Sequence, residues 1–104
     1  MPKKYRLTVD PSAYETLLDY ADFLWQVSPD AADRLELSFK KSLARIADNP
    51  FQFPFADAVV VLYIPPKAYR KCIFEKHYKA LFRLNGYEVI IDAVIDSRME
   101  NVDL

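Results

Sequence analysis

The chain has 104 residues with a formal net charge of −1 at pH 7, and 52% of its residues are hydrophobic. This composition supplies one apolar core, so we expect a single folded domain over residues 1–104 and exclude a disordered chain. The near-zero charge argues against a general nucleic-acid-binding protein, because such proteins usually carry a basic excess.

The first predicted elements are a short strand and a long helix. Tyr5, Leu7 and Val9 alternate with polar residues, which is the period-two pattern of a strand. Asp10 and Pro11 then form a helix start, since Asp caps free N–H groups and Pro suits the first helical position. The apolar stripe of this helix recurs at spacings of three and four, and we expect it to face the core. It consists of Tyr14, Leu17, Leu18, Ala21, Leu24 and Trp25, whereas Phe23 lies off it and is expected to stay exposed on a partner surface.

A second helix is predicted from Pro29 to about Asp48. Ser28 and Pro29 repeat the start signal, and Pro50 stops the helix because the residue before a proline resists helical geometry. Almost no residues separate the two helices, so they should pack as an antiparallel hairpin. The stripe that faces the core comprises Ala32, Leu35, Phe39, Leu43 and Ile46.

The second half of the chain is predicted to form strands. Phe51, Phe53 and Phe55 lie in a proline-punctuated loop that we expect to close one end of the helical hairpin. Residues 59–64 are a candidate strand, and residues 68–98 supply two or three more. The order of elements predicts an α+β fold, in which an N-terminal strand and a helical hairpin are packed on one face of a twisted, mainly antiparallel sheet.

Residues 78–98 are predicted to form a hairpin around Asn85 and Gly86, the residues that a two-residue type I′ turn prefers. This register places Arg83 opposite Glu88 and Lys79 opposite Asp92. The inner face would carry Tyr78, Ala80, Phe82, Leu84, Tyr87, Val89, Ile91 and Ala93, and the outer face Lys79, Leu81, Arg83, Glu88, Ile90, Asp92, Val94, Asp96 and Arg98. If the preceding strand keeps its parity, Lys71, Ile73, Glu75 and His77 join the outer face, and Cys72 and Phe74 turn inward.

Charge is distributed unevenly along the chain. From residue 10 to residue 57, nine acidic residues accompany four basic ones, whereas from residue 67 to residue 83 six basic residues accompany Glu75 alone. The sequence therefore predicts an acidic helical half and a basic strand segment, and the basic segment leaves room for a local anionic partner.

The candidate site residues lie on the predicted outer face. His77 could act as a general acid or base, because an imidazole titrates near neutral pH, or it could be a solvated strand residue. Arg98 could bind a phosphate or a partner, or it could close the strand end by pairing with Asp96 or Glu100. The other candidate cations are Lys71, Lys79 and Arg83, of which the last two could instead form cross-strand ion pairs.

The compartment is predicted from what the sequence lacks. The lone cysteine, Cys72, cannot form an internal disulfide, and the first ten residues contain no apolar stretch typical of a signal peptide. The longest apolar run is too short to cross a bilayer. We therefore expect a cytoplasmic protein without a membrane partner, and one cysteine with one histidine predicts neither a metal site nor a cofactor.

Four features occur along the chain in a set order. These are the initial strand, a helical hairpin that ends as LARIADNPFQFP, the aromatic and basic segment YRKCIFEKHYKALFRL, and a last strand that ends as VIIDAVIDSRMEN. In this order they resemble the RelE/ParE superfamily of toxins from bacterial type II toxin–antitoxin systems, which includes plasmid stabilisation proteins. The resemblance covers nearly the whole chain, and its most specific part is the terminal Arg of the last strand.

The resemblance implies a toxin that a cognate antitoxin neutralises by laying a helix and an extended segment over its surface. RelE-like members cut mRNA on the ribosome, whereas ParE-like members bind DNA gyrase. Arg98 matches the terminal-strand arginine of the ribonuclease members, Lys79 stands where they often have an arginine, and Lys71 lies in the region of their phosphate-binding lysines. In a ribonuclease, Arg98, Lys79 and His77 would be the catalytic residues.

Within this resemblance, the gyrase-directed branch is favoured by the C-terminus MENVDL, which lacks the catalytic Tyr or His that the ribonuclease members have near this point. We therefore expect a growth-inhibiting toxin that binds a target such as DNA gyrase. A ribosome-dependent mRNA endonuclease and a non-toxic binding module of the same fold are the alternatives. Target or partner binding would use Lys71, Lys79, Arg83 and Arg98, and the resemblance is compatible with either a homodimer or a toxin–antitoxin heterotetramer.

Overall fold

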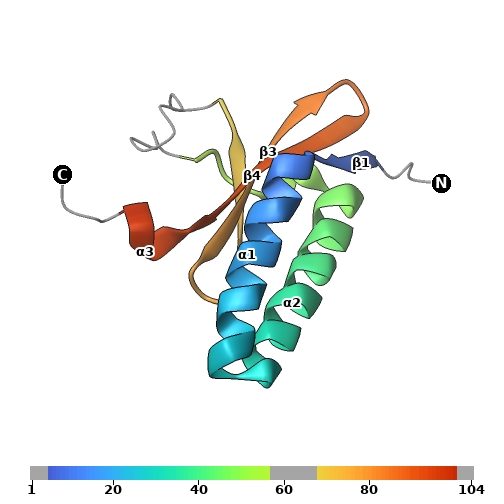
Figure 1. Ribbon diagram of the computed structural model, residues 1–104. Helices are drawn as coiled ribbons and strands as arrows, with labels where there is room; N and C mark the ends of the chain where they lie inside the picture. The colour runs from blue at the N-terminus through green and yellow to red at the C-terminus, as the bar shows by residue number, and fades with distance from the viewer. Residues whose placement is uncertain (1–4, 57–67, 101–104) are drawn as a thin grey trace.

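The computed structural model describes residues 5–56 and 68–100, and within them it has the predicted α+β architecture (Figure 1). Two antiparallel helices, α1 (Pro11–Val27) and α2 (Pro29–Asp48), cover one face of a sheet. The strands are β1 (Arg6–Val9), β2 (Arg70–Phe74), β3 (Tyr78–Asn85) and β4 (Glu88–Asp96), in the order β1-β4-β3-β2. The candidate strand at 59–64 lies outside the described residues.

The helices begin and end where the sequence predicts. The Asp10 carboxylate accepts a hydrogen bond from the Ser12 N–H at 2.8 Å, and the Ser28 hydroxyl accepts one from the Ala31 N–H at 3.3 Å. Both serve as N-caps because the first N–H groups of a helix have no partner within it. After α2, a short 3-10 helix, η1 (Pro50–Gln52), leads into the aromatic loop. A single helical turn, α3 (Ser97–Glu100), follows β4.

The face that α1 buries differs from the predicted stripe. Ala13, Leu17 and Ala21 are buried against the sheet, where β4 is the strand that α1 contacts most. Tyr14, Leu18 and Trp25 are exposed, at 49%, 40% and 56%, so their assignment to the core was wrong. Small residues at 13 and 21 let the helix approach the strands closely, and the larger side chains one position later are turned away by about 100°.

The core itself forms where the sheet and the helices meet. The predicted stripe of α2 is confirmed, with Leu35, Phe39 and Ile46 buried, and Ser42 is a buried polar residue beside them. Of the three phenylalanines expected to close one end, only Phe53 does so, with its ring 5.7 Å from that of Phe82, whereas Phe51 and Phe55 are exposed. Among the described residues, the main core contains the buried apolar residues Ala13, Leu17, Ala21, Leu35, Phe39, Ile46, Phe53, Cys72, Phe74, Tyr78, Ala80, Phe82, Val89, Ile91 and Val94.

The β3–β4 hairpin has a different register from the predicted one. Asn85 pairs with Glu88, so the two loop residues are Gly86 and Tyr87. Gly86 has φ = 63°, and glycine at the first loop position is what a type II′ turn requires. The predicted pairs Arg83–Glu88 and Lys79–Asp92 are therefore wrong.

A bulge then exchanges the faces of β4. Phe82 lies opposite Ile91 and Leu81 opposite Ala93, so Asp92 is an extra residue without a partner in the register. Beyond it, Val94 and Asp96 turn toward the helices, and Ala93 turns away. The prediction was wrong for these three residues, because one inserted residue reverses the parity of every later side chain.

Candidate functional site

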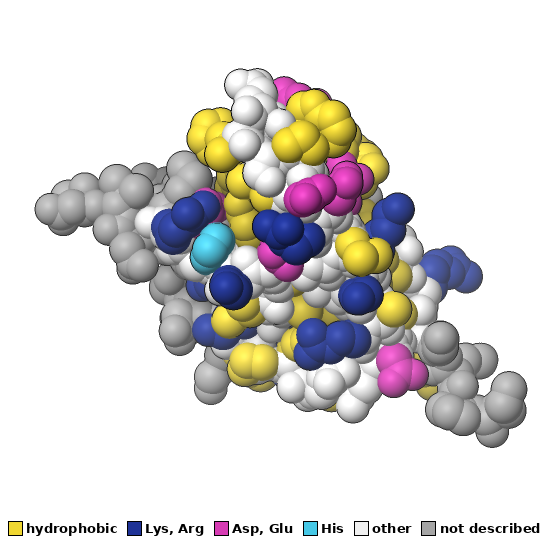
Figure 2. Space-filling view, turned by 90° about the horizontal axis from the view of Figure 1, so that it is seen from below, with side chains coloured by type: hydrophobic (Ala, Val, Ile, Leu, Met, Phe, Trp, Pro, Cys, Tyr) yellow, Lys and Arg dark blue, Asp and Glu magenta, His cyan; other side chains and the backbone are white. Residues whose placement is uncertain are grey.

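The sheet face opposite the helices carries most of the predicted site residues. The register places Lys71, Ile73, Lys79, Leu81, Arg83, Ile90 and Ile95 there, and we call this set the open sheet face. Seen from below, the molecule shows Lys and Arg side chains near the histidine, with hydrophobic and acidic side chains among them (Figure 2). Cys72 and Phe74 are buried on the opposite side, as predicted. The open sheet face thus combines cations with apolar side chains.

Part of this face is covered by Ala56 and Tyr69, which precede β2 in the chain. Leu81 is fully buried, and it forms a second apolar cluster with Ala56, Tyr69, Ala93 and Ile95. Backbone hydrogen bonds hold the cover in place, because the Ala56 N–H donates to the Tyr69 carbonyl at 2.7 Å. Ile73 remains 52% exposed, so the uncovered apolar surface lies toward β2.

Arg83 is held by a partner that sequence reasoning missed. Its Nε donates to Oδ2 of Asp92 at 2.6 Å, and the Tyr69 hydroxyl donates to the same oxygen at 2.8 Å. The hydrogen bond to Asp92 raises the pKa of the Tyr69 phenol and also raises the pKa of Arg83. Glu88, the predicted partner of Arg83, instead accepts a hydrogen bond from Thr8 at 2.9 Å.

Arg98 belongs to a second group of residues at the end of β4. Its Nε and Nη2 donate to the two carboxylate oxygens of Asp96 at 3.0 and 2.7 Å, so the pairing with Asp96 that was one alternative for Arg98 occurs. Asp96 also accepts the backbone N–H of Arg98 at 3.0 Å and thereby caps α3. The strand ends at Asp96, which faces the helical side, so the expectation that Arg98 lies on the open sheet face was wrong.

Aromatic side chains surround this ion pair. The backbone N–H of Asp96 donates to the Tyr20 hydroxyl at 3.3 Å, and the Tyr20 and Tyr78 rings are 5.3 Å apart. The His77 ring lies 5.4 Å from that of Tyr78, and the His77 carbonyl accepts the Ser97 N–H at 2.5 Å. We call His77, Tyr78, Asp96, Arg98 and Tyr20 the strand-end cluster.

Electrostatics keep the strand-end ion pair charged. The hydrogen bond from Arg98 lowers the pKa of Asp96 below its usual value, and the same bond raises the pKa of Arg98. Burial, followed by the nearby Asp96 charge, raises the pKa of the Tyr78 phenol. The Arg98 side chain is 63% exposed, so its remaining N–H groups are accessible to a ligand.

The predicted site residues therefore fall into two groups. Lys71, Lys79 and Arg83 share the open sheet face, whereas His77 and Arg98 belong to the strand-end cluster. Tyr78 lies opposite Asp96, and Arg83 lies five residues further along β3. This separation corresponds to roughly 17 Å along the strand. The structure does not bring these cations to one point.

Arg70 has a structural role that the sequence did not indicate. Its guanidinium lies 4.2 Å from the centre of the Phe55 ring and 5.3 Å from that of Phe51, and it donates to the Phe53 carbonyl at 2.7 Å. These contacts tie the aromatic loop to β2. No local pattern could have revealed them, because the partners lie 15 or more residues away along the chain.

Comparison with known proteins does not identify the chain. No protein-family model matches it, and no curated protein is significantly similar to it. Membership of the RelE/ParE superfamily therefore remains a proposal. Among residues 5–56 and 68–100, no helix has the length and apolar composition needed to cross a membrane, and no cluster of three His, Cys, Asp or Glu side chains is suited to a metal ion.

Proposed function

We propose that this protein is the toxin of a type II toxin–antitoxin system of the RelE/ParE superfamily. It acts in the cytoplasm and inhibits growth by binding a cellular target such as DNA gyrase, and a cognate antitoxin neutralises it. The open sheet face is the target-binding surface, with Lys71, Lys79 and Arg83 as its cations. The antitoxin segment that covers this face carries negative charge.

The main support for binding rather than cleavage is that Arg83 and Arg98 are both already paired with carboxylates. Arg83 is paired with Asp92 and Arg98 with Asp96. A guanidinium that is already neutralised contributes little to the extra negative charge that develops on phosphorus when RNA is cleaved. It is, however, a well-oriented donor for a protein surface, because its rotamer is fixed before the partner arrives.

The composition of the open sheet face also supports protein binding. Ile73 is exposed between Lys71 and Lys79, and Ile90 and Ile95 are half-buried on the same face. Apolar side chains ringed by polar and cationic ones are typical of protein interfaces. A phosphate-binding surface would not need the isoleucines.

A ribosome-dependent mRNA endonuclease is the second candidate. It is favoured by the strand-end cluster, where His77, Tyr78 and the accessible Arg98 surround one carboxylate. In that function Arg98 would stabilise the phosphate and His77 would transfer a proton. Lys79, on the opposite face of the sheet, would take no direct part in that site.

Induced expression in bacteria separates these functions. We expect growth arrest with induction of the DNA-damage response and without new transcript ends. The test variant is Lys71→Glu/Lys79→Glu, and the matched control is Lys40→Glu/Lys41→Glu on the exposed side of α2. Both variants change the net charge equally, so only the test variant should abolish the arrest, provided that circular dichroism shows both to be folded.

Other outcomes point elsewhere. Transcript cleavage that Arg98→Ala abolishes would replace the binding mechanism with the ribonuclease. Unhindered growth with abundant, folded wild-type protein would leave a non-toxic binding module. Equal loss of toxicity in both double variants would show that net charge matters and the open sheet face does not.

A further inference from the structure

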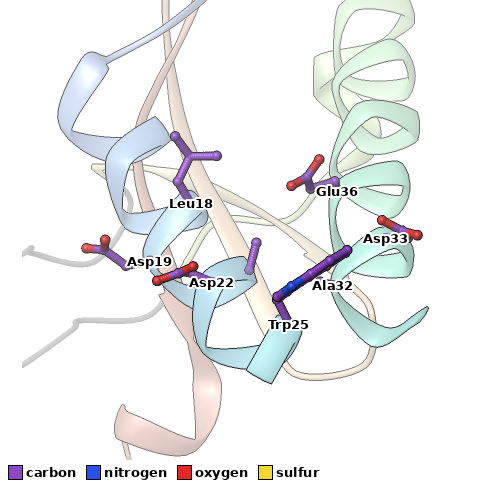
Figure 3. A pocket seen from close by; sticks show the side chains of 8 residues that line it. Leu18, Asp19, Asp22, Trp25, Ala32, Asp33 and Glu36 are labelled. Carbon is purple, nitrogen blue, oxygen red and sulfur yellow. The ribbon is translucent and has the colours of Figure 1, made fainter. Parts of the chain in front are cut away.

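The exposed side of the helical hairpin contains a groove between α1 and α2 (Figure 3). Its volume is about 420 Å³, and its floor is formed by the buried residues Ala21 and Ala32. Leu18 and Trp25 form apolar walls on α1, where they are the side chains that the predicted stripe wrongly assigned to the core. Small side chains in the floor therefore leave room between the helices.

Four carboxylates stand on the rim of this groove. Asp19 and Asp22 come from α1, and Asp33 and Glu36 come from α2, as Figure 3 shows. Among residues 5–56 and 68–100, no Lys or Arg side chain lines this part of the groove, and none of the four carboxylates has an ion-pair partner. Arg34, the adjacent cation of α2, pairs with Glu75 at 3.7 Å and so is directed elsewhere.

The groove continues as an apolar trough toward the start of α1. This part, about 130 Å³ in volume, shares Leu18 and Glu36 with the first and is lined further by Tyr14, Phe39, Leu43 and the cationic Lys40. Trp25 lies eleven positions after Tyr14 on α1, so the two parts together are about 16 Å long, which is three helical turns. The surface is thus elongated and apolar along its middle, with carboxylates on both sides of the larger part and Lys40 beside the smaller part.

The shape and charge of the groove favour one class of ligand. The four carboxylates do not form a cluster suited to a metal ion, since no such cluster occurs among the described residues. A long apolar strip with anionic rims instead matches a helix that has an apolar face and cationic flanks. Two parallel helix walls also provide the groove into which a third helix packs.

We propose that the α1–α2 groove docks an amphipathic helix of about three turns from another protein, with apolar side chains on one face and Lys or Arg on both flanks. This partner differs from the one proposed for the open sheet face, which has the opposite charge. The inference does not rest on the proposed function, because docking in the groove needs neither toxicity nor a gyrase target.

Trp25 offers a direct measurement, since it is the only tryptophan in the chain and lies in the groove. The probe is a synthetic peptide of about 11–14 residues with leucine at helical spacing and lysine on both flanks. Titration of the full-length protein should shift the Trp25 emission with saturation. The reference peptides are a scramble of the same composition, which destroys the apolar face, and a version with Glu in place of every Lys.

The matched variants are Asp22→Asn/Asp33→Asn in the rim and Glu15→Gln/Asp48→Asn outside it. Each pair removes one negative charge from α1 and one from α2. The rim variant loses two contacts, so its affinity for the lysine peptide should fall about tenfold. The variant outside the rim should change this affinity less than about twofold. Equal weakening by both pairs would show general charge attraction and would overturn the proposal.

The reference peptides supply the remaining outcomes. Equal affinity for the scrambled or the glutamate peptide, or no response of Trp25 to the lysine peptide, would also refute docking of a basic amphipathic helix. A second copy of this chain in the groove would appear in sedimentation as a dimer that Trp25→Ala dissociates, and that result would replace the proposed partner.

Discussion

Arg83 on β3 and Asp92 on β4 form an ion pair of 2.6 Å at the point where the register of the two strands shifts. Asp92 is available for this contact because it is the bulge residue and has no partner in the register. The same extra residue reverses the faces of β4 beyond it, which turns Asp96 toward the helices and takes Arg98 with it. One inserted residue therefore decides which cations share the open sheet face.

The Tyr69 hydroxyl should stabilise this arrangement measurably. Tyr69→Phe removes its hydrogen bond to Asp92 and should lower the free energy of unfolding by about 0.5–1.5 kcal/mol in urea denaturation. Tyr14→Phe is the matched control, since that hydroxyl lies on an exposed ring without a described partner, and it should have no measurable effect. Equal changes in the two variants would contradict the assigned role of Asp92.

Ionisation of Tyr69 provides an independent check on the same contact. The hydrogen bond to Asp92, with burial and the carboxylate charge, raises the pKa of the phenol. Asp92→Asn should therefore lower the pKa of Tyr69 toward its ordinary value, as followed by ultraviolet difference titration at alkaline pH. An unchanged titration would mean that Asp92 does not contact the phenol in solution.

Two adjacent leucines test the orientation of α1. Leu17 is 2% exposed and faces the sheet, so Leu17→Ala should cost about 2–5 kcal/mol of unfolding free energy. Leu18 is 40% exposed in the groove, and Leu18→Ala should cost less than about 1 kcal/mol. Chemical denaturation of both variants gives the comparison. Similar losses of unfolding free energy in the two variants would support the stripe predicted from the sequence, in which both leucines face the core.

Substitution of Gly86 should destabilise the protein because of its backbone conformation alone. Its φ is +63°, and a Cβ placed there would meet no atom within 4 Å, so no clash contributes. Gly86→Ala should lower the free energy of unfolding by about 1 kcal/mol, and Gly86→Asn by less, because Asn tolerates positive φ better than Ala. A thermal melt in which the two variants are equally stable would argue against the observed turn.

The ion pair between Asp96 and Arg98 should stabilise the fold at neutral pH, and this stabilisation should be lost in acid. Arg98 lowers the pKa of Asp96, so the folded state favours the ionised carboxylate. The stabilisation is present above the ordinary value of 3.8 and is lost as the pH falls through the lower pKa of the folded state. The difference in unfolding free energy between wild type and Arg98→Gln should therefore shrink below pH 3.8.

The control for this experiment is Lys40→Gln, which removes one positive charge from an exposed helical site. Its stability difference from wild type should not show the same decline in acid. If the Arg98→Gln difference is constant from pH 7 to pH 2, the Asp96 carboxylate does not depend on Arg98 in solution.

The sequence by itself determined the helices, the fold class and most of the core. Asp10–Pro11 and Ser28–Pro29 predict both helix starts because capping is local, and the stripe of α2 is strong enough to fix its buried face. Cys72 and Phe74 were placed inward correctly, since alternation along one strand needs only its own residues.

Only the tertiary structure decided the site. The bulge at Asp92, the partner of Arg83 and the position of Arg98 depend on contacts between strands, and no local spacing encodes an inserted residue. The rotation of α1 likewise depends on how closely Ala13 and Ala21 can approach β4. Local patterns specify elements, but the relative positions of charged side chains follow from register and packing, which are settled when the elements meet.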